Sequence, residues 1–402
     1  MAEVDSIIPG HYVVTFKPQI SSETAGQHIT RTHDIVLQRA TQIPGSTFHG
    51  VNHRYDFSGF AGYSGSFDDV TVGELRISSE VAIVEPDRLF YTLKDTLHTQ
   101  ENVPSWGLSR ICRDKAVGGA TTYVYPSANG QNTHAYVIDT GIYIEHDEFN
   151  NDNVRRARWG TTIVSKGAKD QDFEGHGTHV AGTIAGQQCG VAKKAEVIAV
   201  KVFKDLTDQE RRDGKHTSAS NSDIIKAVEW SVKDAGSKIR RSVINMSLRS
   251  GKSEALNKAI RSAVSAGMAV VVASGNDGKD AINYSPASAF EAITVGATDR
   301  DDKNYVNSNY GKCVDVLAPG VDIKSAGIGG VSELVVMTGT SMAAPHVTGV
   351  VCCIFTSDPD DPTQSPATAI QTVKKVAGRD EITLANQKDT LNLMLNNGFH
   401  VK

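Results

Sequence analysis

The sequence predicts an α/β protein in which a small α/β sandwich domain precedes a mostly parallel sheet flanked by helices. Two observations lead to this prediction. After Trp106, apolar β-branched runs alternate with long helical stretches, a pattern typical of parallel strands covered on both faces. Before that residue, shorter strand and helix patterns follow one another, as in a sheet with its helices on one face.

The first region contains three expected strands and two expected helices. Asp68 and Asp69 open the second helix, and Pro86 stops the last strand. The strands are expected at 11–16, 55–62 and 81–87, and the helices at 22–38 and 67–78. Residues 92–105 are polar, contain Pro104 and predict a linker.

The second region alternates strands and helices more regularly. Strands are expected at 134–139, 196–203, 242–248 and 268–274, with helices at 221–236 and 253–267. Ligand chemistry in parallel sheets lies beyond the carboxyl ends of the strands. Asp139 and Asn276 both fall at such ends, which makes them candidates for function.

Composition excludes several classes of partner. The chain has 402 residues, enough for two domains, and a net charge of −5 with both signs mixed along it. A nucleic-acid binder would need a basic face. No apolar run reaches the roughly 18 residues of a membrane span. We therefore expect neither a nucleic acid nor a membrane as partner.

The N-terminus and the cysteines bear on the compartment. The start, MAEVDSIIPG, lacks a basic segment followed by an apolar stretch, so no secretory signal is visible. The five cysteines are odd in number and sparse, which favours buried thiols over a disulfide framework. Both observations favour an intracellular protein. The alternative is a secreted protein whose signal has been removed ahead of Met1.

Two short motifs contain an acid and a base. VIDTG ends an expected strand with Asp139, which taken alone is an ordinary turn residue. EGHGTHVAGTIAG places His176 between two glycines ahead of a helix. This second motif has two other interpretations, a helix-capping loop and a metal site built from Glu174, His176 and His179. The metal site is weak for zinc because no third strong ligand is nearby.

A third motif, TGTSMAAPHVTG, places Ser341 at the start of a helix. Ser341 is either a simple N-cap or a nucleophile at the positive end of the helix dipole. The order Asp139, His176, Ser341 favours the nucleophile. A serine hydroxyl needs a histidine to take its proton and a carboxylate to orient that histidine. Asn276, in VVASGNDG, and the Ser341 main-chain N–H would then stabilise the oxyanion.

Taken together, these motifs resemble those of a known family. The motifs VIDTGI, GHGTHVAGTIAG, NMSL, ASGNDG, NYSPAS and GTSMAAPHV are similar to those of the subtilisin family, with the proteinase K branch nearest. The resemblance covers roughly residues 106–398 and implies a serine endopeptidase acting on polypeptides. It implies that Asp139 orients His176, that His176 is general base and then acid, and that Ser341 is the nucleophile. Asn276 would be the oxyanion donor.

The first 91 residues resemble the inhibitory propeptide of this family, through HYVVTF, YDFSGFAG and VAIVEPD. The resemblance implies three parts: a propeptide over 1–91, a linker with the processing site over 92–105, and a peptidase domain over 106–402. The propeptide would assist folding and act as an intramolecular inhibitor until the enzyme cuts it off. The protein would thus be made as a self-processing zymogen.

The sequence departs from the family around the substrate cleft. The family's binding segment continues Gly-Gly after Ser-Leu, but here Ser247 and Leu248 are followed by Arg249. The opposite flank corresponds to 217–219, which includes Ser218, and Gly275 precedes the oxyanion asparagine. Arg249 would either enter the pocket beside the scissile bond or swing into solvent.

A calcium site and a loss of activity are two further alternatives. The resemblance requires no cofactor, but in the proteinase K branch an Asp matching Asp315 binds a structural calcium ion. A surface carboxylate is the other interpretation of Asp315. The rival to an enzyme is a non-catalytic relative that keeps the fold. A fluorophosphonate probe separates the two, because it labels only an activated Ser341.

Overall fold

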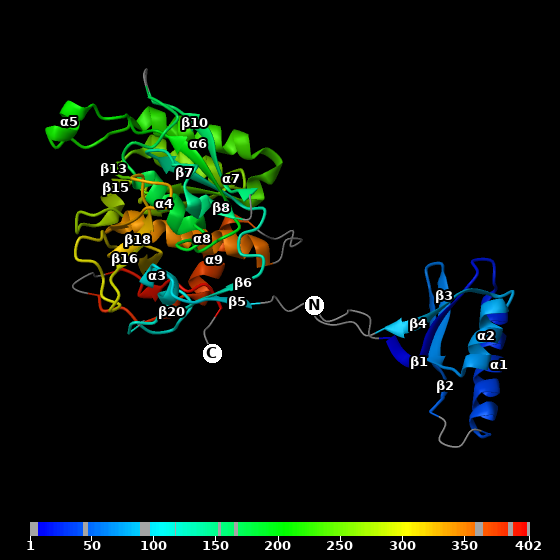
Figure 1. Ribbon diagram of the computed structural model, residues 1–402. Helices are drawn as coiled ribbons and strands as arrows, with labels where there is room; N and C mark the ends of the chain where they lie inside the picture. The colour runs from blue at the N-terminus through cyan, green and yellow to red at the C-terminus, as the bar shows by residue number, and fades with distance from the viewer. Residues whose placement is uncertain are drawn as a thin grey trace. The chain divides into compact units, whose positions relative to one another are not determined.

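The computed structural model describes residues 7–42, 47–88, 97–116, 118–151, 154–164, 168–357, 365–384 and 389–399. The chain forms two compact units, Met1–Lys94 and Asp95–Lys402 (Figure 1). Within the described residues no helix has both the length and the apolar character needed to cross a bilayer.

The first unit is a four-stranded sheet with two helices. The strand order is β2-β3-β1-β4, and the pairs that β1 forms with β3 and β4 are antiparallel. Its elements are β1 (Ile7–Phe16), α1 (Ser22–Ala40), β2 (Gly50–Phe57), β3 (Phe60–Ser66), α2 (Asp69–Ile77) and β4 (Val81–Arg88). Asp68 caps α2 through a bond from the Thr71 N–H to its side chain, which explains why the helix begins there. The expected sandwich is confirmed.

One expected strand of this unit is wrong. The segment 55–62 is not a single strand but the turn of a hairpin between β2 and β3, in which Phe57 pairs with Phe60. Ser58 and Gly59 adopt positive φ angles of 34° and 86° at that turn. A two-residue hairpin turn with positive φ at both positions suits the twist of the strands. Ser58-Gly59 is a dipeptide that favours a turn, and the expected strand passed over it.

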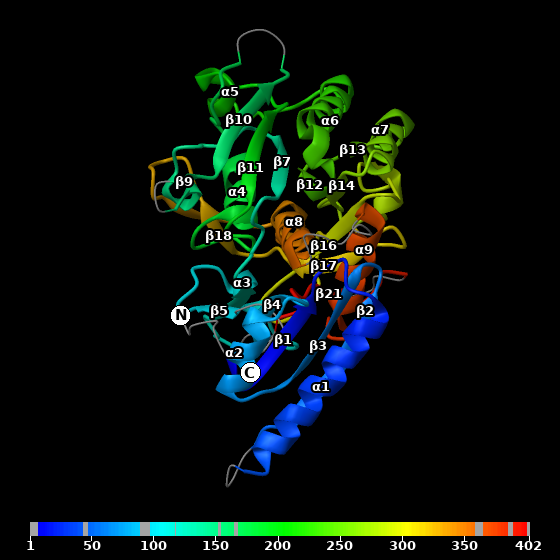
Figure 2. The ribbon, with the colours of Figure 1, turned by 90° about the vertical axis from the view of Figure 1, so that its right-hand side faces the viewer.

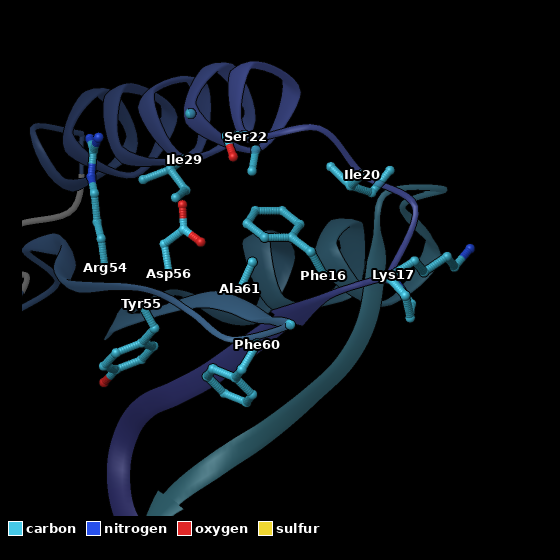
Figure 3. A pocket seen from close by; sticks show the side chains of 14 residues that line it. Phe16, Lys17, Ile20, Ser22, Ile29, Arg54, Tyr55, Asp56, Phe60 and Ala61 are labelled. Carbon is cyan, nitrogen blue, oxygen red and sulfur yellow. The ribbon is translucent and has the colours of Figure 1, made fainter.

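A hollow of about 300 Å³ lies in the first unit between α1 and the strands. Phe16 and Asp56 point from the strands toward α1, and Ile29 points back from the helix (Figure 3). Tyr55 and Phe60 point to the other side of the sheet. The hollow therefore belongs to the first unit and contains none of the candidate site residues.

The second unit is built on a nine-stranded sheet of order β10-β11-β7-β12-β14-β16-β17-β21-β20. Every neighbouring pair in it is parallel except β20 with β21. Its strands are β7 (His134–Asp139), β10 (Ala157–Thr162), β11 (Glu196–Lys201), β12 (Ser242–Met246), β14 (Ala269–Ala273), β16 (Ile293–Thr298), β17 (Val316–Pro319), β20 (Gly378–Arg379) and β21 (Leu393–Met394). The four strands expected from sequence are all central ones.

Helices cover both faces of this sheet. Along β7, Ala135 and Val137 pack into a core shared with α4 (His176–Ala185), α8 (Thr340–Ser357) and α9 (Pro366–Val376). Tyr136 and Ile138, on the alternate face, pack with α6 (Asn221–Ala235) and α7 (Glu254–Ser265). Figure 2 shows α6 and α7 beside β12 and β14. A strand buried on both faces has to be apolar throughout, which is why these runs were visible in the sequence.

Shorter elements complete the unit. They are β5 (Leu97–Gln100), α3 (Trp106–Arg110), β6 (Tyr123–Pro126), η1 (Asp147–Phe149), β8 (Asn150–Asn151), β9 (Val154–Arg155), α5 (Asp208–Arg212), η2 (Gly236–Arg241), β13 (Ser250–Gly251), η3 (Ala281–Asn283), β15 (Tyr284–Ser285), β18 (Ile323–Ala326) and β19 (Leu334–Met337). The expected linker at 92–105 is only partly described, since 92–96 lie outside the described residues. Its later part forms β5, which pairs antiparallel with β6.

Candidate functional site

Asp139 and His176 meet at the carboxyl edge of the sheet. Asp139 is the last residue of β7 and is fully buried, while His176 is the first residue of α4. The two side chains are joined by a contact of 2.8 Å between Asp139 Oδ1 and His176 Nδ1. Gly177 allows this approach, because a Cβ there would lie 2.2 Å from the Gly141 carbonyl oxygen. The sequence-predicted acid and base are therefore in contact.

A second carboxylate, which sequence reasoning missed, supports the histidine. Asp172 is buried and accepts bonds from the main-chain N–H groups of Glu174, Gly175 and Thr178 and from the Thr178 hydroxyl. It thereby fixes the first turn of α4. An Asp shortly before a Gly-flanked histidine at a helix start is a capping signal that could have identified it.

The two carboxylates determine the protonation behaviour of His176. Burial by itself lowers the pKa of this imidazole, because it disfavours the charged form. The charge and hydrogen bond of Asp139, with the charge of Asp172, outweigh that effect and raise the pKa above its ordinary value. The side chain keeps 32% of its surface exposed, so its other nitrogen is accessible.

Ser341 is the second residue of α8 and is partly exposed. Its hydroxyl donates to the Ser247 carbonyl oxygen at 3.2 Å, and the Ser247 hydroxyl donates to the Ser341 carbonyl oxygen at 2.9 Å. In the described part of the chain no hydrogen bond joins Ser341 to His176. A hydroxyl rotates freely, and such bonds often form only once substrate is bound.

Asn276 follows β14 and is exposed to solvent. Its Oδ1 accepts bonds from the Thr340 N–H at 2.9 Å and the Thr340 hydroxyl at 3.0 Å. These donors fix which end of the amide is oxygen, so Nδ2 is directed elsewhere. A Cβ on Gly339 would lie 3.0 Å from that Nδ2, and the glycine, at φ 148°, leaves room for it. Thr340 is thus a second supporting residue that the sequence did not reveal.

Four of the five expected cleft residues lie on two segments beside Ser341. Ser247, Leu248 and Arg249 directly follow β12, and Leu248 is buried. Gly275 follows β14 and has a φ of 104°, and its N–H donates to the Thr340 hydroxyl at 3.2 Å. The fifth, Ser218, is exposed and follows the charged segment that carries α5.

The residues around Asp315 do not fit a calcium ion. Asp315 Oδ1 lies 2.6 Å from the Lys374 ammonium nitrogen, and Oδ2 accepts the Thr294 N–H at 2.9 Å. Burial raises the pKa of Asp315, and Lys374 and the Thr294 bond offset only part of that rise. An ammonium group thus already neutralises the carboxylate that the resemblance assigns to calcium.

The alternative metal site at His179 does not form either. His179 is buried, and its Nε2 contacts the Ile323 carbonyl oxygen at 2.9 Å. Burial lowers the pKa of His179 to about 4, so it is neutral and structural. Across the described residues, no group of three or more His, Cys, Asp and Glu side chains could hold a metal ion.

Comparison with known families gives two matches. Residues 130–398 match the model of the subtilase family, and residues 11–93 match that of the peptidase inhibitor I9 family. The chain is 39% identical over 396 residues to alkaline protease 1 of Aspergillus flavus, covering 97% of this chain and 92% of that protein. It is 40% identical over 392 residues to subtilisin-like protease 1 of Pseudogymnoascus destructans, covering 98% and 90%.

A solved structure is also similar. The crystal structure of a cold-adapted subtilisin-like serine proteinase matches with a TM-score of 0.64 and 34% sequence identity. The match covers 74% of this chain and 99% of that one. Both the sequence and the fold of the larger unit thus point to one family.

Proposed function

The chain belongs to the subtilase family, as a serine protease that hydrolyses peptide bonds, and we propose that Asp139, His176 and Ser341 are its catalytic triad. Ser341 attacks the scissile carbonyl while His176 takes its proton. His176 then returns that proton to the leaving amine, and water releases the acyl group by the same steps. Asp139 holds the imidazole in the required tautomer and stabilises its cation.

The contact between Asp139 Oδ1 and His176 Nδ1 is the observation that carries this proposal. It places the proton of the neutral imidazole on Nδ1, which leaves Nε2 as the acceptor for a serine proton. Asp139 is buried, and the charges of Asp139 and Asp172 both favour the imidazolium that forms during attack. The raised pKa of His176 is consistent with that role.

The oxyanion is held by two donors in this proposal. Asn276 Nδ2 is free to donate because its Oδ1 is engaged by Thr340. The Ser341 N–H lies at the N-terminal end of α8, where main-chain N–H groups are unpaired and the helix dipole favours negative charge. Donors already in place need no reorganisation when charge develops, which lowers the barrier.

The I9 domain makes the chain a zymogen with its inhibitor in the same polypeptide. We propose that Ser341 also cuts the chain within 92–105. The pairing of β5 with β6 supports a cut on the N-terminal side of this strand, because the pairing would keep the new end on the second unit. Sequencing the N-terminus of the purified mature protein locates the cut.

We place polypeptide substrates between the segments 217–219 and 247–251. Ser218 is exposed, and its carbonyl oxygen accepts the Lys204 N–H at 3.4 Å. An extended peptide would therefore pair with the other main-chain groups of this segment. On the other flank, β13 is already paired with β15. Arg249 alters this second flank, where relatives with Gly-Gly would present no side chain.

The test is Ser341→Ala, compared with Ser332→Ala on a surface loop. We expect the Ser341 variant to lose peptide hydrolysis and fluorophosphonate labelling and to remain an unprocessed chain, because one nucleophile serves both reactions. The Ser332 variant should process and react as the unchanged protein does. Complete processing of the Ser341 variant in a protease-free host would refute self-cleavage, and retained hydrolysis would refute the triad.

A further inference from the structure

Two segments lie beside the nucleophile, because Ser247 is hydrogen-bonded to Ser341 and Gly275 to Thr340. This argument rests on the proposed function: the scissile carbonyl must lie within reach of Ser341 Oγ with its oxygen at Asn276. β12 and β14 are adjacent parallel strands, with Met246 opposite Val272, so the two strands end at the same edge of the sheet. These segments, 247–249 and 275–277, follow the two strands. We take the space between them as the recess that receives the substrate side chain preceding the scissile bond.

Arg249 spans these two segments. Its Nη2 lies 2.7 Å from Asp277 Oδ1, so a residue after β12 is bound to a residue after β14. Its Cδ lies against Gly275, where an added Cβ would be only 3.2 Å from it. The guanidinium also lies 5.7 Å from the centre of the Tyr284 ring on β15. The Arg249 side chain therefore extends from one of these segments to the other, with 46% of its surface still exposed.

The acceptor of this bridge is held in place from behind. Asn309 is buried, and its Oδ1 accepts the Asp277 N–H at 3.0 Å. Its Nδ2 donates to Asp277 Oδ2 at 3.3 Å and to the Ser274 carbonyl oxygen at 3.0 Å. Asp277 keeps 18% of its side-chain surface exposed, against 46% for Arg249. The carboxylate is thus the fixed end of the bridge and the arginine the movable end.

We propose that the Arg249–Asp277 bridge shortens this recess, so that the protein cleaves after small, uncharged side chains. A large aromatic side chain would have to displace Arg249 from Gly275. An acidic substrate side chain gains little binding energy from Arg249, because Asp277 already neutralises the guanidinium. A basic side chain gains little from Asp277, because Arg249 already neutralises the carboxylate. One methylene group in such a pocket changes kcat/KM by about 10- to 200-fold, so the discrimination is measurable.

The test is a peptide library varied only at the residue before the cleaved bond, run on four proteins. These are the unchanged protein, Arg249→Gly, Asp277→Asn and the control Arg261→Ala. Arg261 is a matched arginine that pairs with a carboxylate, Glu291, away from the cleft segments. The unchanged protein should prefer Ala, Ser or Gly over Phe by about tenfold or more in kcat/KM.

The two cleft variants should change the profile in different directions. Arg249→Gly opens the space over Gly275. It should raise kcat/KM for peptides with Phe or Leu before the cleaved bond by about tenfold relative to those with Ala. Asp277→Asn leaves the guanidinium without its carboxylate. It should instead raise kcat/KM for peptides with Asp or Glu before the cleaved bond. Arg261→Ala should match the unchanged protein. Superimposable profiles for Arg249→Gly and the unchanged protein, or an unchanged protein that already prefers Phe, would overturn the inference.

Fluorophosphonate labelling separates this inference from the proposed function. Labelling of Ser341 in every variant, together with an unaltered profile, would remove Arg249 as a specificity residue and leave the triad standing. Absence of labelling in the unchanged, processed protein would instead overturn the proposed function. Asp277→Asn keeps the shape of the side chain, so it tests the bridge even if Arg249→Gly folds poorly.

Discussion

Lys374→Met tests whether an ammonium group has taken the place of a structural cation at Asp315. The change keeps most of the side-chain volume and removes the charge that lies 2.6 Å from the carboxylate. Asp315 keeps only 18% of its side-chain surface exposed, and among the described residues it would be left with the Thr294 N–H as its side-chain partner. We therefore expect the variant to be less stable at pH 8.

The magnitude follows from the exposure of the pair. Breaking a fully buried ion pair costs about 3–5 kcal/mol, whereas exposed pairs contribute about 0–1 kcal/mol. With Lys374 35% and Asp315 18% exposed, an intermediate loss of about 1–3 kcal/mol in the free energy of unfolding is expected. For a unit of this size that corresponds to a fall in Tm of about 2–5 °C.

The loss should depend on pH in a definite direction. Burial already raises the pKa of Asp315, and removing Lys374 raises it further. The destabilisation of the variant is therefore present above the raised pKa, where the carboxylate is ionised. It disappears as the pH falls through that pKa, because the carboxyl group is then protonated. The variant and the unchanged protein should melt closer together at acid pH than at pH 8.

Calorimetry in a Ser341→Ala background avoids self-digestion and gives the readout. At pH 8 and with calcium removed by a chelator, Lys374→Met should melt below its parent. Calcium should recover stability in the variant more than in the parent, up to about 2.7 kcal/mol at 100 times Kd. Asp315→Asn/Lys374→Met is the matched control and should not respond in this way. Equal melting of Lys374→Met and its parent in chelator would refute the reasoning.

Three further changes test the site and the first unit. Asn276→Ala should keep the fold and lower turnover by about 10²- to 10³-fold, a range established on subtilisin itself; turnover within a few-fold of the parent would make Asn276 a turn residue. Asp139→Asn should lower kcat by about 10⁴-fold. It should also move the acid limb of the pH profile downward, because His176 works as the neutral base and Asp139 raises its pKa; an unmoved limb contradicts this. Residues 1–91, added in trans at micromolar concentration, should inhibit the mature protein by strand addition at the cleft, and unchanged activity would show that they are no inhibitor.

The sequence predicted best what is encoded in contiguous stretches. The central strands of the larger sheet were recognised because burial on both faces requires uninterrupted apolar runs, and the structure agrees at β7 from His134 to Asp139. Strand β17 escaped because four residues, Val316–Pro319, are too few for a periodic signal. The hairpin at Ser58 was missed because the expected strand passed over the Ser58-Gly59 dipeptide, which favours a turn.

In the candidate site, too, the sequence predicted the residues that lie in local motifs and missed those that support them. Asp139, His176 and Ser341 each lie in a short motif that can be recognised locally, and the structure places the first two in contact. Asp172 and Thr340 were missed because their roles are to hold neighbouring groups through hydrogen bonds, which have no signature of their own in the sequence. The direction of the Arg249 side chain was likewise undetermined, since it depends on Asp277, a residue on another segment.

Two ion pairs of the second unit share one physical form. Arg249 with Asp277, and Lys374 with Asp315, each join segments that are distant in the sequence. Removing one partner alone leaves the other charge unpaired. A single variant therefore measures the cost of that unpaired charge as well as the loss of the pair. A double-mutant cycle isolates the pair itself, because residues in contact couple whereas distant ones add. If the Arg249–Asp277 bridge acts as a unit, Arg249→Gly/Asp277→Asn should show the profile of Arg249→Gly alone, since the asparagine then has no guanidinium to release.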